Sequence, residues 1–377
     1  MTTNIDLSVQ VFGHTFRNPI IPAAGPNVGS GAMVRRAAEG GAGGLLAKTI
    51  SSIAAPVPHP NMVRLGRDSL LDTELWSELS PERWFEHEYD LALGAAHEYQ
   101  LPLIASVGYT AEDLTALGPR LEAVGVNIIE FSIHYLDKQR LMDTAQALRE
   151  AVSLPIVAKL SPHAGDLGEI AQVLEPYVDG FACINSFGPT LMIDIERGES
   201  PLGSQYGYGW LSGSAVKPLA VRSVFEVARA THKPVIGVGG VTRGEDVIEF
   251  FMAGASLVGV CTAAILKGPA VYGKIAEETA QWLEAHGYRS MDELKGLYLE
   301  KYRRGQPVVT TVEQTAWVNE SRCKACGTCE KVCQFNALHA PLKEIAHVDV
   351  ERCAACGLCV SVCPSNALEM RQRESIL

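Results

Sequence analysis

The chain has 377 residues, 47% hydrophobic and 20% charged, with a formal net charge of −11. This composition excludes a disordered chain and allows a large core. An acidic chain without a basic stripe or arm is not expected to bind nucleic acid, because phosphate binding needs clustered lysine and arginine. No apolar run reaches the length of a membrane span, and residues 1–16 lack the basic and apolar regions of a secretory signal. We therefore expect a cytoplasmic protein that does not enter a membrane.

Short apolar, β-branched runs alternate with amphipathic stretches up to about residue 290. Continuous apolar strands separated by helices predict a parallel sheet covered on both faces. Eight such units favour an α/β fold, a (β/α)₈ TIM barrel over residues 1–300, with a doubly wound open sheet as the alternative. The eight runs are NPIIPAAG, GGLLAKTI, PLIASVGY, VNIIEFSI, PIVAKLSP, VDGFACINS, PVIGVGGV and SLVGVCTA.

Two longer segments, at about 51–100 and 187–211, follow predicted strands. In a barrel of this kind, the loops after the strands form the active face. We therefore expect both insertions on that face, together with polar residues that follow other strands. These residues are Lys48, His134, Tyr135, Lys159, Asn185 and Ser186.

Lys48 and Lys159 lie in runs that are otherwise apolar, LLAKTI and IVAKLS. A buried lysine without a partner destabilises a fold by several kcal/mol. Each lysine therefore needs an anionic or electron-rich partner.

Eight of the ten cysteines lie between Cys323 and Cys363, which marks a separate C-terminal module. They form two C-x₂-C-x₂-C-x₃-C runs, a spacing typical of bacterial-type ferredoxins, in which the fourth cysteine of each run ligates the other [4Fe–4S] cluster. The spacing predicts an α+β ferredoxin domain over 319–377, after a linker over 301–318. One cluster would be bound by Cys323, Cys326, Cys329 and Cys363, and the other by Cys333, Cys353, Cys356 and Cys359.

Structural zinc and a redox dithiol are the alternatives for these cysteines. Zinc sites rarely carry two four-cysteine runs at this spacing, so clusters are favoured. A module of about 60 residues builds little core, and the clusters are expected to hold it folded. Two adjacent clusters suit the transfer of single electrons.

A group that exchanges single electrons with clusters and also reacts with an organic substrate is most often a flavin. Its phosphate needs backbone donors, which Gly239 and Gly240 offer at the end of one predicted strand and Cys261 and Thr262 at the end of the next. Loops after strands seven and eight form the usual phosphate site of these barrels. A dinucleotide site is disfavoured because the G-x-G-x-x-G spacing is incomplete. The alternative is that these glycines only form tight turns.

The chain resembles the C-terminal half of the dihydropyrimidine dehydrogenases and the catalytic subunit of their bacterial two-subunit form. That group belongs with the class I dihydroorotate dehydrogenases. The resemblance runs from about Asn18 through the cysteine module. It rests on the motifs NPIIPAAGP, LLAKTIS, LLDTELWSELS, PIVAKLSP, INS, GWLSGSAVKPLAVRSV and GVGGVTRGEDVIEFFMAGASLVGVCTA.

The resemblance implies an FMN site and a substrate site. The residues implied for FMN are Ala23, Ala24, Lys48, Thr49, Lys159, Ile184, Ser212, Gly213, Gly239, Gly240, Cys261 and Thr262. Those implied for the substrate are Asp72, Ser132, Asn185 and Ser186. Asp72 and Ser132 stand where the family has asparagines, and a carboxylate at 72 would repel a carboxylate substrate such as orotate. The alternative for Asp72 is a loop carboxylate that faces water.

The family ends its fourth strand with a cysteine acid and a long mobile loop, whereas this chain has His134 and Tyr135 and goes almost directly into a helix. Flavin chemistry on an activated C=C bond needs a proton donor on the far face of the substrate. By position in the motif Tyr135 is favoured and His134 is second. The alternative is that either side chain only packs at the barrel rim.

These observations predict an FMN- and iron–sulfur-dependent oxidoreductase that acts on an activated C=C or CH–CH bond of a small molecule, with a substrate that differs from pyrimidines. Its electrons would pass to or from a separate subunit or a ferredoxin, and family analogy suggests a homodimer. The alternatives are an electron-transfer subunit without substrate chemistry of its own and a barrel that only binds a ligand.

Overall fold

The computed structural model describes residues 5–132, 138–306 and 313–373. The chain forms two compact units, Met1–Gly305 and Gln306–Leu377. Over the described residues no helix is long and apolar enough to cross a membrane.

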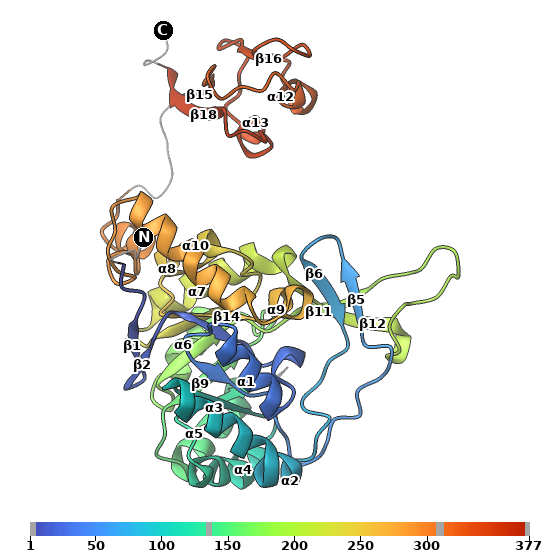
Figure 1. Cartoon of the computed structure of the whole chain (residues 1–377), viewed down its shortest axis with the longest axis vertical. Helices are drawn as coiled ribbons and strands as arrows, with labels where there is room; N and C mark the ends of the chain where they lie inside the picture. Colours follow the sequence, from blue (N-terminus) through green and yellow to red (C-terminus); the bar gives the residue numbers. More distant parts are fainter. Residues whose placement is uncertain (1–4, 133–137, 307–312, 374–377) are drawn as a thin grey trace. The chain divides into compact units, whose positions relative to one another are not determined.

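The first unit is built on eight parallel strands that curve into a nearly closed barrel (Figure 1). The seam between the first and last strands of the sheet is bridged by the Gly43 N–H, which donates to the Ile20 carbonyl at 2.7 Å. The TIM-barrel prediction is confirmed, and the open sheet is excluded. The order around the barrel is β3 (Ile20–Pro22), β14 (Leu257–Val260), β13 (Val235–Val238), β10 (Gly180–Cys183), β9 (Ile156–Leu160), β8 (Ile128–Ser132), β7 (Leu103–Val107) and β4 (Leu45–Leu46).

Helices pack around the outside of this barrel. Their starts follow local capping chemistry: Thr110 and Asp113 form a reciprocal capping box, and the Asp166 side chain accepts from the Glu169 N–H. The helices are α1 (Gly31–Glu39), α3 (Tyr89–Tyr99), α4 (Ala111–Val124), α5 (Lys138–Ala151), α6 (Leu167–Leu174), α7 (Lys217–Ala230), α8 (Gly244–Ala253) and α10 (Val271–Ala285).

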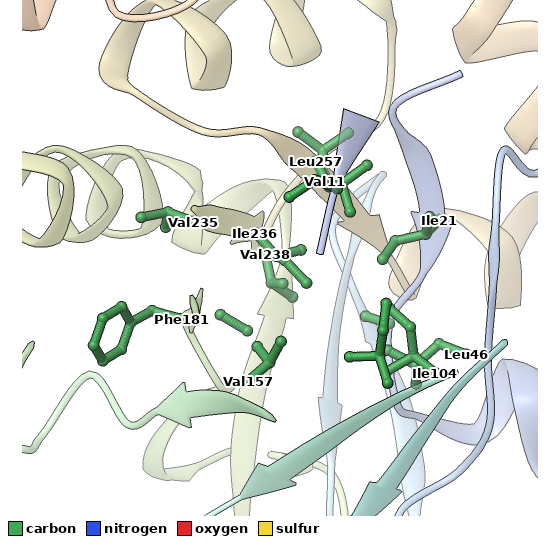
Figure 2. Packing of buried hydrophobic residues seen from close by; sticks show 14 of the residues in the cluster. Val11, Ile21, Leu46, Ile104, Val157, Phe181, Val235, Ile236, Val238 and Leu257 are labelled. Carbon is green, nitrogen blue, oxygen red and sulfur yellow. The ribbon is translucent and has the colours of Figure 1, made fainter. Parts of the chain in front are cut away.

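The strand side chains form one continuous core with the inner faces of the helices. Ile21, Leu46 and Ile104 lie on neighbouring strands within this core (Figure 2). Each fully buried side chain of this size stabilises the fold by about 1.5–3 kcal/mol. The N-terminal hairpin of β1 (Val9–Val11) and β2 (His14–Phe16) adds to the core through its buried valines.

Both predicted insertions contribute strands to one antiparallel sheet outside the barrel. The insertion after β4 supplies β5 (Met62–Leu65) and β6 (Ser69–Asp72), and the insertion after β10 supplies β11 (Phe187–Leu191) and β12 (Tyr208–Gly213). The order is β11-β12-β6-β5, so the central pair joins one insertion to the other. In that pair Asp72 is opposite Trp210 and Leu70 is opposite Ser212.

Over its described residues the second unit has two short antiparallel pairs and two short helices, which confirms the predicted ferredoxin-like α+β arrangement. The predicted linker over 301–318 contains the end of α11 (Leu297–Arg303) and the whole of β15. The strand β15 forms by pairing with β18, and the sequence of residues 301–318 alone does not indicate this pairing. The boundaries at 300 and 319 stay a prediction. The elements are β15 (Gln314–Val318), α12 (Thr328–Val332), β16 (Leu338–His339), β17 (His347–Val348), α13 (Leu358–Ser361) and β18 (Leu368–Gln372).

Candidate active site

A cavity of about 370 Å³ opens at the carboxyl ends of the barrel strands. Its volume lies within the range of small-molecule sites in proteins. The structure brings every described residue of the predicted FMN and substrate sites to its lining. They are Ala23, Ala24, Lys48, Thr49, Asp72, Ser132, Lys159, Ile184, Asn185, Ser186, Ser212, Gly213, Gly239, Gly240, Cys261 and Thr262. The two predicted proton donors, His134 and Tyr135, lie outside the described residues.

Lys159 belongs to a buried polar layer inside the barrel. Its Nζ lies 3.9 Å from the Glu130 Oε1, and both side chains are at most 5% exposed. The Ser106 hydroxyl donates to the same carboxylate at 3.1 Å and lies 2.8 Å from the Thr49 hydroxyl. Four neighbouring strand ends or loops thus contribute one polar group each. Because the Lys159–Glu130 distance is long, the Lys159 ammonium can still donate a hydrogen bond to a group in the cavity that it lines.

Lys48 has a closer carboxylate partner. Its Nζ donates to the Glu74 Oε2 at 2.7 Å, and the Asn61 amide donates to the other oxygen at 2.6 Å. The sequence predicts that Lys48 needs a partner but does not identify Glu74. The available signal is that Glu74 follows Asp72 by two residues in an apolar segment and so extends along the same side of the insertion.

Asp72 lies in the cavity beside a second carboxylate. Burial raises the pKa of Asp72 to about 7, and the charge of Glu74 raises it further in the same direction, while Lys48 acts against this. The Ser212 hydroxyl lies 3.4 Å from Asp72 Oδ2, and the Thr262 hydroxyl donates to Ser212 at 2.9 Å. Asp72 therefore lies in the lining of the cavity, at the end of β6.

The glycine segment after β13 is followed by a turn that side chains of α7 and α8 fix through hydrogen bonds. Gly239 and Gly240 have φ of 127° and 84°, a region that favours glycine. Asp246 of α8 accepts from the N–H groups of Thr242 and Arg243 at 2.8 and 3.2 Å, and Lys217 of α7 donates to it at 2.8 Å. Within the described chain the N–H groups of Gly239 and Gly240 donate no hydrogen bond, so they remain available to an anion in the cavity.

Cys261 is held as a neutral thiol at the end of β14. Its Sγ lies 3.0 Å from the Asn27 Oδ1, and the Asn27 amide donates to the Tyr272 hydroxyl at 3.0 Å. Burial raises the pKa of Cys261 to about 12. The thiol therefore donates a hydrogen bond and is not a thiolate nucleophile at neutral pH.

Three aromatic side chains that were not predicted as site residues also line the cavity: Trp76, Tyr109 and Trp210. The rings of Trp76 and Tyr109 are 5.3 Å apart, and burial raises the pKa of Tyr109 well above its usual range. Asp113 fixes this turn by accepting from the Tyr109 N–H at 2.8 Å. Tyr109 is the polar residue at the end of the apolar run PLIASVGY, and a polar residue at the end of such a run is the signal that identifies Asn185 in VDGFACINS.

The cysteines of the second unit border two separate small hollows. One is lined by Cys323, Cys326, Cys329 and Cys363, and the other by Cys333, Cys353, Cys356 and Cys359. These are the two sets of four that the repeat predicts, although cluster ligation itself stays a prediction. All ten cysteines of the chain are free of disulfides. Among the described residues no group of three or more His, Cys, Asp or Glu side chains is arranged to hold a metal ion.

The structure combines a (β/α)₈ barrel, which has a polar cavity at its strand ends, with a ferredoxin-like unit, and flavin-dependent oxidoreductases are one class with this combination. A model of the dihydroorotate dehydrogenase family matches residues 134–283, and a model of the 4Fe-4S dicluster domain matches residues 316–370. The chain belongs to the dihydroorotate dehydrogenase family.

Relatives of the barrel are catalytic subunits of dihydroorotate dehydrogenase B (NAD(+)). The Pyrococcus furiosus protein is 30% identical over 311 residues, which cover 78% of this chain and 99% of the relative. The Methanothermobacter thermautotrophicus protein is 32% identical over 306 residues, or 77% and 98%. The Bacillus pumilus protein is 35% identical over 213 residues, or 53% and 67%. These relatives bear the name of dihydroorotate, so the narrower resemblance to dihydropyrimidine dehydrogenases stays a prediction.

Proposed function

We propose that the chain is an FMN- and iron–sulfur-dependent oxidoreductase that interconverts an activated C=C bond and a CH–CH bond in a small molecule other than a dihydropyrimidine or dihydroorotate. The observation that carries this proposal is the cavity, which gathers polar side chains from separate strand ends together with two open backbone donors. The nearest named activity is that of the dihydropyrimidine dehydrogenases.

The cavity fits a flavin mononucleotide in its chemistry. The N–H groups of Gly239 and Gly240, at the end of strand seven of the barrel, suit a phosphate, because they donate to no acceptor in the part of the chain that the structure describes. Lys48 and Lys159 bring positive charge to the same cavity. When bound, the flavin would supply hydride transfer to one carbon of the substrate. Lys159 would stabilise negative charge on the ring more than Lys48, because its carboxylate partner is farther away.

The substrate end of the cavity is acidic. Asp72 and Glu74 lie together there, and Lys48 is paired with Glu74. A carboxylate substrate such as orotate placed beside this pair would find the Lys48 ammonium already bound by Glu74, so repulsion between like charges would disfavour it there. A neutral substrate with N–H groups, or a cationic one, would instead donate to Asp72. Asn185 and Ser132, linked at 3.2 Å, would supply further polar contacts, and Ser186 lies beside them.

The substrate carbon next to the one that accepts hydride needs a proton. Tyr135 is the proposed donor, with His134 second, because both follow β8 where the family carries its acid. Both lie outside the described residues, so their assignment rests on sequence position.

The second unit would carry two [4Fe–4S] clusters on the two cysteine sets and pass single electrons to or from the flavin. A separate electron-transfer subunit or a ferredoxin would exchange these electrons with the clusters. A homodimer and a cytoplasmic location stay predictions of the sequence.

An anaerobic reaction tests the proposal. The purified protein is reduced at its flavin and clusters and then mixed with uracil, thymine or orotate while the visible spectrum is followed. We expect no reoxidation by orotate. Reoxidation by uracil or thymine with formation of the dihydropyrimidine would identify pyrimidine chemistry, and Tyr135→Phe should then slow it.

Two other results would change the assignment. Reoxidation by orotate would overturn the exclusion of dihydroorotate. If no activated alkene reoxidises the protein but a one-electron acceptor does, the chain is an electron-transfer subunit without substrate chemistry.

A further inference from the structure

The two cysteine runs of the second unit are repeats, and at two of the positions where they differ one run has a hydroxyl and the other an apolar side chain. CKACGTCEKVCQFNAL starts at Cys323, and CAACGLCVSVCPSNAL starts at Cys353. Thr328 of the first run corresponds to Leu358 of the second. Ser365 of the second run corresponds to Phe335 of the first. Each run therefore contributes one hydroxyl and one apolar side chain at these positions.

Both hydroxyls lie beside cysteines of the same set. The Thr328 Oγ1 is 3.3 Å from the Cys326 Sγ, and the Ser365 Oγ is 3.7 Å from the Cys363 Sγ. A thiolate that ligates iron can only accept, so each hydroxyl would donate. Cys326 and Cys363 line one hollow although they are far apart in the sequence. The fourth cysteine crosses over, and this brings the two hydroxyls to one site.

Both apolar side chains line the other hollow. Phe335 and Leu358 border the Cys333, Cys353, Cys356 and Cys359 set. The backbone donors to the crossing cysteines are matched: the Ala367 N–H lies 3.2 Å from the Cys363 Sγ, and the Ala337 N–H lies 3.3 Å from the Cys333 Sγ. The side-chain hydroxyls, not the folds of the two halves, make the difference.

Cys353, in the set without these two hydroxyls, has other donors nearby that would stabilise negative charge on its own sulfur. The Ala316 N–H lies 3.5 Å from its Sγ, and the buried hydroxyl of Thr315 lies beside it. Arg373 donates to the Cys353 carbonyl at 2.6 Å, but its charge points at this oxygen and is half-buried, so solvent screens it. The Cys323, Cys326, Cys329 and Cys363 set thus has two side-chain hydroxyls beside its sulfurs, and the other set has one hydroxyl, one long amide contact and a screened cation.

Hydrogen bonds to cluster sulfurs stabilise the reduced state, which carries one more negative charge, and so raise the reduction potential. We propose that Thr328 and Ser365 make the Cys323, Cys326, Cys329 and Cys363 cluster the higher-potential site of the pair. This rests on the proposed function, in which both sets hold clusters. If both clusters are bound, one electron supplied by a one-electron donor such as dithionite, which is thereby oxidised, would at equilibrium reside mainly on the cluster held by Cys323, Cys326, Cys329 and Cys363, while the other cluster would stay oxidised. No proton or bond is exchanged.

A redox titration of the full-length protein followed by electron paramagnetic resonance tests this order. Thr328→Val removes one hydroxyl at nearly constant shape, and Ser365→Ala removes the other. Each change should lower the potential of the cluster that is reduced first and leave the second step in place. The mirrored change Leu358→Thr adds a hydroxyl beside the other set and should raise the second step. Combined with Thr328→Val, it should narrow the gap between the two steps or reverse their order.

The outcomes separate this inference from the cluster assignment. Iron and sulfide analysis should give about eight irons per chain for two [4Fe–4S] clusters, and a lower content in the unmodified protein would end both. With a full iron content, the inference alone is overturned if Thr328→Val and Ser365→Ala shift the step reduced second, or shift neither step.

Discussion

The two units of the chain relate core and site in opposite ways. The barrel has a continuous apolar core, and its polar site lies at the strand ends above that core. Among its described residues the second unit has a core of seven buried residues, and two of these, Cys329 and Cys359, are cysteines of the two sets. In the barrel the fold is expected to persist without its cofactor. In the second unit the ligands are part of the core, so losing the clusters should unfold it.

The largest effect should come from a cysteine of the second unit. Cys329→Ser replaces a buried member of one set, and we expect loss of that cluster and cooperative unfolding of the unit, while the barrel keeps its melting transition. Limited proteolysis and circular dichroism with iron analysis would show this. Cys183→Ala is the matched control in the barrel core: it should keep the full iron content and lower stability by about 1–2 kcal/mol. A proteolysis-resistant second unit without iron would contradict the comparison.

The next effect concerns the buried pair under the cavity. Lys159→Ala leaves the Glu130 carboxylate buried without its partner and should lower the free energy of unfolding of the barrel by about 3–5 kcal/mol. The double change Lys159→Met with Glu130→Leu removes both charges and should recover most of this loss in denaturant titrations. Arg35→Ala breaks an exposed pair with Glu98 and should change little. An equal loss in the single and double variants would show that the charges do not interact.

A smaller effect is expected in the glycine segment. Gly240 has φ of 84°, and a Cβ there would lie 2.6 Å from the Lys217 Cβ. Gly240→Ala should therefore destabilise the barrel by about 2–3 kcal/mol and lower the flavin content of the purified protein. Gly165→Ala is the control, because φ is 85° and nothing lies within 4 Å of the added Cβ. It should lower stability by only about 1 kcal/mol and keep the flavin. Equal flavin loss in both would show that the contact with Lys217 is unimportant.

The smallest effect is the pH dependence due to Asp72. Its folded-state pKa is raised from 3.8 to about 7. The unfolded chain therefore releases this proton first, and stability falls as pH rises from about 4 to 7, by about 1–2 kcal/mol because the open cavity moderates the shift. Asp72→Asn should remove that part of the slope in denaturant titrations at several pH values. The same variant should admit orotate better, whereas an unchanged slope would place Asp72 in contact with water.

Much of the fold follows from patterns within single segments. The eight apolar runs identify all eight barrel strands, and the spacing of the cysteines identifies their two sets. The sequence could not identify Glu74 as the partner of Lys48 or Glu130 as the partner of Lys159, because these contacts join different strands and insertions. The strand β15 was missed for the same reason, since its partner β18 lies about fifty residues away. Pairing across a sequence gap depends on tertiary packing, which local periodicity does not encode.

The central pairing of β6 with β12 has a consequence for how this pocket can change. Each insertion supplies one of the two strands: β6 carries Asp72, and β12 carries Trp210 and Ser212. Shortening either insertion would leave the other with an unpaired edge strand in contact with water, a liability for aggregation. New substrate preferences should therefore evolve by point substitutions within both strands or by joint replacement of both insertions, and exchange of a single loop between relatives should give poorly soluble chimaeras.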